Sequence, residues 1–183
     1  MKSELYISGI SIVLIICIII LVMSVITYVN TKNNTLSLGG IQVYPGVIMD
    51  VSDTSTTVKL SKISYIDTQH FELIEEDSTI RIKSHGIYEI SYSLTFSNTN
   101  NSGGQYASIS GAVHHNNALL VNSSSSCFLR KQGTSSIITS CGKSILFNAK
   151  MESTISLVCM RIKGTTSCQT IADECSLTII KIS

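Results

Sequence analysis

The sequence has no tryptophan, a single proline and few charged residues. Charged residues make up 14% of the chain, against about a quarter in an ordinary soluble domain. The net charge is +1, and the basic residues are spread along the chain without a patch interleaved with aromatics. This pattern argues against a nucleic-acid partner.

Sequence motifs for catalysis and for cofactor binding are also missing. The chain contains no Gly-x-Ser-x-Gly, no phosphate-binding loop, no His-Glu-x-x-His and no dinucleotide fingerprint. An acidic cluster at 75–77 lies between two expected strands, so a solvated turn explains it better than a Ca²⁺ site. No Cys-x-x-Cys spacing supports zinc. We expect neither an enzyme nor a cofactor, and only a fast-reacting cysteine would argue for an enzyme.

A long apolar run occupies the N-terminus. Leu5–Val29 contains no charged residue, and about 20 apolar residues are enough for a helix to cross a bilayer. A buried soluble helix and a cleaved signal peptide are the alternatives. The run is longer than the core of a signal peptide, and no small-residue cleavage site follows it. We expect a transmembrane signal anchor over 5–29, a cytoplasmic N-terminus over 1–4 and a polar stalk over 30–40.

Cysteines and glycosylation sequons suggest which side of the membrane the larger part occupies. Of six cysteines, Cys17 lies in the anchor and five follow it. Five is an odd number, so two disulfides and one free or intermolecular thiol are expected. The candidates are Cys127 with Cys141, joining neighbouring strands, and Cys168 with Cys175, flanking an expected hairpin loop.

Three Asn-x-Ser/Thr sequons begin at Asn33, Asn100 and Asn122. Together with the anchor and the cysteines they favour a secretory-pathway protein whose C-terminal part faces outward. The expected localisation is therefore a single-pass membrane protein with an extracellular domain, on a cell surface or a viral envelope.

Residues 41–183 read as one short strand after another. About eight to ten strands with turn signals between them predict an all-β sandwich or barrel. No helical spacer typical of a parallel sheet separates them. The last strand, Ser176–Ile182, has apolar residues on both faces, with Ile180 and Ile182 opposite Leu177 and Ile179. This pattern predicts a central strand that is either buried on both faces or packed on the core with one face and on another subunit with the other.

Gly86–Phe96 reads "GIYEISYSLTF" and, Ile87 apart, alternates between apolar and polar residues. In a strand, every second side chain points to the same face, so one face carries five apolar or aromatic side chains: Tyr88, Ile90, Tyr92, Leu94 and Phe96. Periodicity alone does not distinguish the core of one chain from a contact between subunits, because water is excluded from both.

The block from Ser78 to Phe96 resembles the signature of the tumour necrosis factor (TNF) and complement-q globular-head superfamily, where Gly-x-Tyr opens a long aromatic-rich strand. "SILFNAKMESTISLVCM" is similar to a strand–turn–strand near the end of these domains, and "CSLTIIKIS" is similar to their terminal strand. The sequence departs from the family at Lys150–Glu152, where a Gly-Asp turn is common, and it has no collagen stalk.

The resemblance implies a TNF-like jelly-roll sandwich that forms a homotrimer and binds a cell-surface receptor, as a cytokine-like ligand does. The trimer interface or the core would hold Tyr88, Ile90, Tyr92, Leu94, Phe96, Ile180 and Ile182. The exposed loops for binding would be Ser97–Gly104, Asn122–Ser126 and Gly164–Glu174. The alternative is a surface or virion attachment protein that does not signal.

Overall fold

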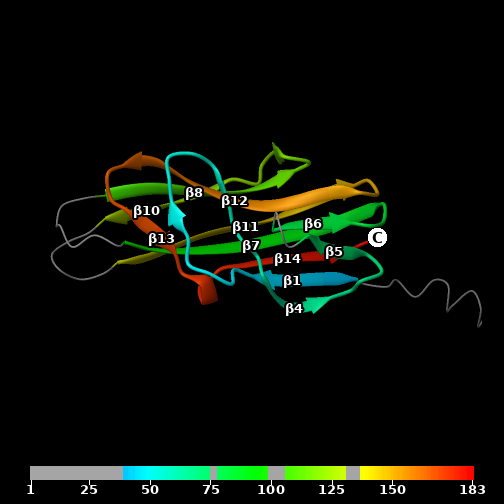
Figure 1. Cartoon of the computed structure of the whole chain (residues 1–183). Helices are drawn as coiled ribbons and strands as arrows, with labels where there is room; N and C mark the ends of the chain where they lie inside the picture. The colour runs from blue at the N-terminus through cyan, green and yellow to red at the C-terminus, as the bar shows by residue number, and fades with distance from the viewer. Residues whose placement is uncertain (1–38, 75–77, 99–105, 131–136) are drawn as a thin grey trace, which may run out of the picture. The chain divides into compact units, whose positions relative to one another are not determined.

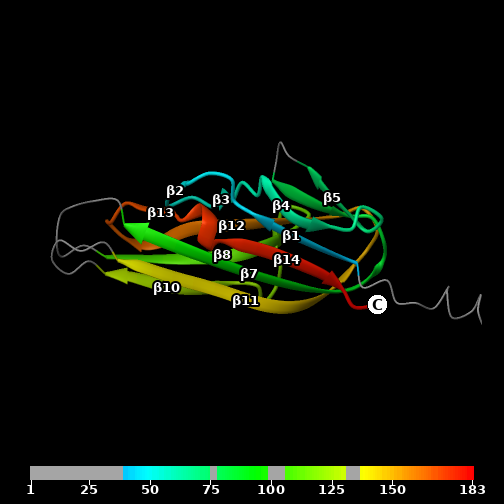
Figure 2. The same cartoon turned by 90° about the horizontal axis from the view of Figure 1, so that it is seen from below.

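The computed structural model describes residues 39–74, 78–98, 106–130 and 137–183. The expected anchor, most of the stalk and the sequons at Asn33 and Asn100 lie outside these residues. Within them, no helix is long and apolar enough to cross a membrane. The described chain forms two facing antiparallel sheets, as Figures 1 and 2 show from two directions. The expectation of an all-β sandwich is confirmed.

The first layer, here called the β7 sheet, is built around the 13-residue strand β7. It contains β1 (Gly40–Tyr44), β2 (Asp50–Val51), β4 (Lys62–Ile66), β7 (Gly86–Asn98), β11 (Ile138–Ala149), β13 (Cys168–Thr170) and β14 (Ser176–Lys181). Strand β11 pairs with one edge of β7, and β13 and β14 pair one after the other along its opposite edge. Strands β1 and β4 continue the sheet beyond β14.

The second layer, the β8 sheet, has β8 and β12 at its centre. It contains β3 (Thr56–Thr57), β5 (Phe71–Ile74), β6 (Thr79–Ile82), β8 (Tyr106–His115), β9 (Ala118–Leu119), β10 (Ser125–Arg130) and β12 (Ser153–Gly164). Its order is β10-β8-β12-β6-β5, and β3 pairs with β12 beyond the end of β6. A single 3-10 turn, η1 (Ala172–Glu174), precedes β14.

The core lies between the two sheets and is filled mainly by alternate residues of the long strands. Tyr88 and Phe96 on β7 are fully buried, and the Tyr88 ring meets Phe71 edge-on, with centroids 5.8 Å apart. Edge-to-face contacts of this kind stabilise aromatic pairs beyond their burial. The alternation in Gly86–Phe96 therefore does what its period predicts, placing one face of β7 in the core.

Strand β14 is central, as expected, because it lies between β7 and β1. Another expectation needs correction. No hairpin joins Cys168 to Cys175, because β13 and β14 run in the same direction along one edge of β7. Polar turn-like residues between them suggested a reversal that the chain does not make.

Candidate functional site

The outward surface of the β7 sheet is one candidate for a binding surface in the described chain. Residues directly opposite each other in an antiparallel pair share a face, so the register defines which side chains point away from the core. On β7 these include Ile87, Glu89 and Ser91, whose partners on β11 are Asn148, Leu146 and Ser144. On β14, Thr178 and Ile180 lie opposite Ser91 and Glu89. We call the outward residues of β7, β11 and β14 the outer β7 face.

The outer β7 face is nearly free of charge and combines a few exposed apolar side chains with many small hydroxyl side chains. Leu146 is 73% exposed and Ile180 is 38% exposed, and small side chains such as Ser91 and Ser144 lie between them. Glu89 is the one charged outward residue on these three strands, which the structure describes in full. Its carboxylate accepts a 2.7 Å hydrogen bond from the Ser144 hydroxyl, which itself accepts one of 2.9 Å from Ser91.

The residues proposed for a trimer interface or core divide into two groups. Five are in the core of the single chain: Tyr88, Ile90, Leu94 and Phe96 are fully buried, and Tyr92 is 5% exposed. They have no surface left for a partner, so burial within one chain accounts for the aromatic face of β7. Ile180 and Ile182 differ, because both remain about two-fifths exposed on the opposite side.

Sequence reasoning missed Leu146 and Ile87 as members of this surface. Alternation around Leu146 in "SILFNA" places it opposite Phe147, but only the register with β7 shows that it stands beside Glu89. Ile87 is the one apolar residue in the polar half of the β7 pattern. It lies on the outer β7 face and adds exposed apolar area there.

Five cysteines fall in the described chain, and all five are free thiols. Cys127 on β10 and Cys141 on β11 come from opposite sheets and meet at one edge of the sandwich. A hydrogen bond with Cys141 lowers the pKa of Cys127, and the same contact raises the pKa of Cys141. Cys175 contacts the backbone rather than another thiol: its sulfur accepts a 3.2 Å hydrogen bond from the Thr95 amide.

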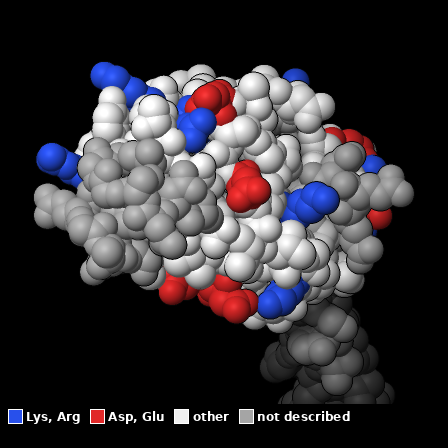
Figure 3. Space-filling view, turned by 60° about the vertical axis from the view of Figure 1, so that its left-hand side comes forward, with Lys and Arg blue, Asp and Glu red and all other residues white. Residues whose placement is uncertain are grey.

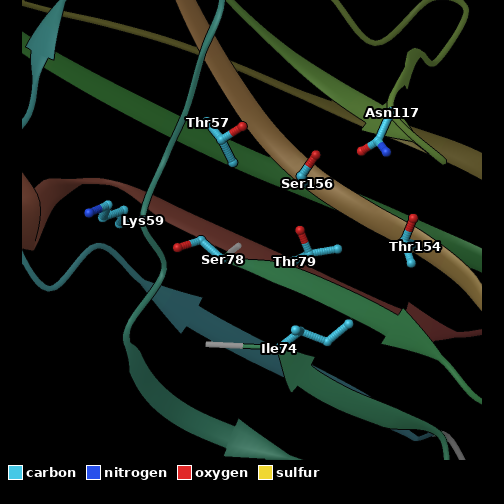
Figure 4. A pocket seen from close by; sticks show the side chains of 8 residues that line it. All are labelled: Thr57, Lys59, Ile74, Ser78, Thr79, Asn117, Thr154 and Ser156. Atoms are coloured by element: carbon cyan, nitrogen blue, oxygen red, sulfur yellow. The ribbon is translucent and has the colours of Figure 1, made fainter. Parts of the chain in front are cut away.

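A polar groove opens on the outward surface of the β8 sheet. It has a volume of about 460 Å³. It lies along β12 at the point where the pairing with Thr79 of β6 stops and the pairing with Thr57 of β3 starts. Figure 4 shows its side chains around a common space, and hydroxyls dominate them: Thr57, Ser78, Thr79, Thr154 and Ser156. The described residues contain no group of metal-ligating side chains that could hold an ion.

Asn122 is the one sequon asparagine in the described chain. It is exposed in a turn before β10 and adopts a left-handed conformation, with φ of 62°, which asparagine tolerates better than most residues. The neighbouring Ser123 is buried and bonds both backbone groups of Val113 at 3.0 Å. The turn is thus held from the inside while the Asn122 side chain stays accessible.

The surface charge is sparse on the face shown in Figure 3, where lysine, arginine, aspartate and glutamate stand singly or in small mixed groups. The shortest described ion pair joins Arg161 and Asp53, with 2.6 Å between Nε and Oδ1. No continuous basic or acidic surface is visible there that would attract a highly charged partner.

Comparisons with known proteins bear on the fold. No family model matches the sequence, and no curated protein matches it either. Solved structures do match. Eiger TNF from S. frugiperda aligns over 80% of this chain and 93% of its own, with a TM-score of 0.56 and 11% identity. Murine APRIL, crystallised at pH 5.0, aligns over 80% of this chain and all of its own, with a TM-score of 0.52 and 12% identity.

The chain has a TNF-like jelly-roll fold. At this level of identity the match concerns the path of the backbone. The match therefore describes the fold, and the functional consequences have to be argued from the residues of this chain.

Proposed function

We propose that the chain is a single-pass type II membrane protein whose C-terminal domain forms a homotrimer and binds a cell-surface receptor, as a TNF-like ligand. One observation carries the proposal. In this TNF-like jelly roll the outer β7 face is nearly uncharged and carries exposed apolar side chains that no other described residue covers. The apolar run over 5–29 supplies the anchor, and residues 30–40 supply a short stalk.

The composition of the outer β7 face suits a contact between subunits. The centres of such contacts are rich in apolar side chains and depleted in charge. Leu146, Ile180 and Ile182 contribute exposed apolar area, and the serines beside them allow close approach. Glu89 keeps a hydrogen-bond partner when water leaves, because Ser144 already donates to it. A carboxylate with a partner costs less to bury than an unpaired one.

A trimer would be suited to bind a receptor through several weak contacts at once. Three identical heads on one membrane present each loop three times, so weak single contacts add up to strong binding by avidity. The turn at Asn122 is one described loop available for such contacts, whereas the segment from Gly164 to Glu174, expected as a loop, is largely taken up by β13 and η1. A receptor bound in this way would be clustered, which is how a ligand without catalytic groups produces a signal.

Two modifications belong to this proposal. In an oxidising compartment, Cys127 and Cys141 would join β10 to β11 and tie the two sheets together at one edge. Asn122 would carry an N-linked glycan, because it is the accessible asparagine of its sequon.

The deciding experiment is the native mass of the full-length protein by light scattering in detergent, corrected for bound detergent. Three times the protomer mass of 19.8 kDa supports the proposal and justifies adding the trimer to cells bearing candidate receptors. A protomer of single mass over the whole accessible concentration range contradicts it. A stable trimer that neither binds nor clusters any surface protein would contradict the receptor half alone.

A further inference from the structure

The groove on the β8 sheet has a definite structural origin. Strand β6 pairs with β12 as far as Thr79 and Ser156, and β3 takes over at Thr57 and Val158. The change of partner leaves a notch along the same edge of β12. Ile74 at the end of β5 adds an apolar side chain to one wall.

A turn fixes the opposite wall of the groove. Asn116 and Asn117 both have left-handed backbone, with φ of 48° and 64°, which is the conformation that a tight two-residue hairpin requires. The Asn116 side chain accepts hydrogen bonds from the amide and the hydroxyl of Thr154, at 2.9 and 3.1 Å. The turn is therefore clamped to β12, and the Asn117 amide group is held beside the groove.

Ser156 is the residue that points to a ligand. It is 7% exposed, yet its hydroxyl makes no hydrogen bond with any other residue that the structure describes. The hydroxyl oxygen of Ser156 lines the groove and is open to solvent there, so a ligand in the groove can reach it (Figure 4). The Thr57 hydroxyl and the Asn117 amide group also lack a partner within the described residues.

We propose that this groove binds a saccharide of one or two rings. Sugar hydroxyls donate and accept hydrogen bonds at once, and the hydroxyls of Ser156 and Thr57 and the amide of Asn117 match both roles. Ile74 offers an apolar surface to the C–H face of a sugar ring. The volume of about 460 Å³ lies within the range of small-molecule sites, about 300–1,000 Å³.

The groove is on the opposite sheet from the outer β7 face, so it stays open when that face is covered. The saccharide site therefore does not depend on the proposed trimer, and either one can fail without the other. If both hold, each trimer would carry three such grooves, and a surface rich in glycans would be bound with avidity.

The test uses the full-length protein, produced without N-glycans and kept in a detergent that has no sugar headgroup. Saturation-transfer NMR is run with four probes: galactose, N-acetylglucosamine, lactose and 3′-sialyllactose. We expect transfer to at least one of them. Ser156→Ala and Thr57→Val should each weaken that binding about fivefold or more, because each removes a hydrogen bond to the ligand.

A matched variant separates this site from general effects of mutation. Ser108→Ala removes a hydroxyl from the outward side of β8, outside the groove, and should leave binding unchanged. Because the Ser156 hydroxyl has no protein partner, Ser156→Ala should also keep the thermal midpoint of the wild type. Absence of transfer to all four probes, or binding that both groove variants retain, would overturn the proposal.

Discussion

The Tyr92 hydroxyl lies 2.7 Å from the carbonyl oxygen of Ser123 and 2.8 Å from that of Gly111. A core tyrosine of β7 thereby reaches across the sandwich to the start of the β10–β8 ladder, where Ser125 pairs with Gly111. The contact also explains why residue 111 is glycine, since an added Cβ would lie 2.5 Å from Leu94 Cδ1 and 3.2 Å from the Tyr92 ring. Burial raises the pKa of Tyr92, so the hydroxyl remains a donor at all physiological pH values.

Tyr92→Phe should therefore lower the free energy of unfolding by about 1–3 kcal/mol, because it removes the one buried O–H donor that the carbonyl oxygens of Ser123 and Gly111 share. Urea unfolding followed by circular dichroism measures it. Tyr65→Phe is the control, since Tyr65 is 56% exposed and should change stability little. Equal effects at the two positions would show that the hydroxyl of Tyr92 contributes nothing specific.

The outer β7 face can be tested with a pair of matched substitutions. Ile180→Asp puts a second carboxylate opposite Glu89, and burying it between subunits should weaken the proposed trimer by about a hundredfold or more. Ile162→Asp makes the same change at an isoleucine of β12 that is 52% exposed, outside the outer β7 face. Light scattering across a dilution series should show dissociation for the first variant alone. A trimer unaffected by Ile180→Asp would exclude this face as the contact.

The buried thiols make stability depend on pH in the alkaline range. Burial raises the pKa of Cys159 to about 12 and that of Cys168 to about 11, from an ordinary value of 9.0. The unfolded chain therefore loses these protons first, and the stability they contribute below pH 9 is lost as pH rises toward 11–12. Between pH 9 and its folded-state pKa, each thiol should lower the free energy of unfolding by about 1.4 kcal/mol per pH unit.

Urea unfolding at pH 8, 9 and 10 checks this expectation. Cys159→Ala should be less stable at pH 8 because it loses packing, yet its stability should fall less steeply between pH 9 and 10. A slope identical to that of the wild type would mean that Cys159 does not titrate on unfolding.

The thiol pair at the edge of the sandwich should react in a fixed order. Hydrogen bonding to Cys141 lowers the pKa of the half-buried Cys127, so Cys127 should be alkylated first in the reduced, folded protein. Peptide mapping by mass spectrometry identifies the labelled residue. The same mapping without reductant, on protein secreted by cells, should find Cys127 linked to Cys141. Early labelling of Cys159 or Cys175 would show that the folded structure opens more readily than its core implies.

The core of the fold was predictable from the sequence because one long strand carries an unusually regular pattern. Alternation through Gly86–Phe96 placed Tyr88 and Phe96 on a dry face, and apolar residues on both sides of Ser176–Ile182 indicated a central strand. Short strands such as β2 and β13 were not predictable, since two or three residues carry no period.

The surface sites were harder to predict for a different reason. The outer β7 face depends on the register between β7 and β11, which sets Leu146 beside Glu89. The groove depends on where β12 exchanges β6 for β3. Register and strand exchange are relations between segments far apart in the chain, and no local pattern in one sequence determines them.

The position of β14 sets a condition on how the protein is made. Strand β14 is synthesised long after β1 yet lies between β1 and β7, so this sheet cannot close until β14 has left the ribosome. Until then β1 and β7 have unpaired edges on these sides, and folding depends on contacts between distant parts of the chain, which makes it slow. A chain that lacks β14 would keep these edges unpaired and would be expected to be degraded rather than to function.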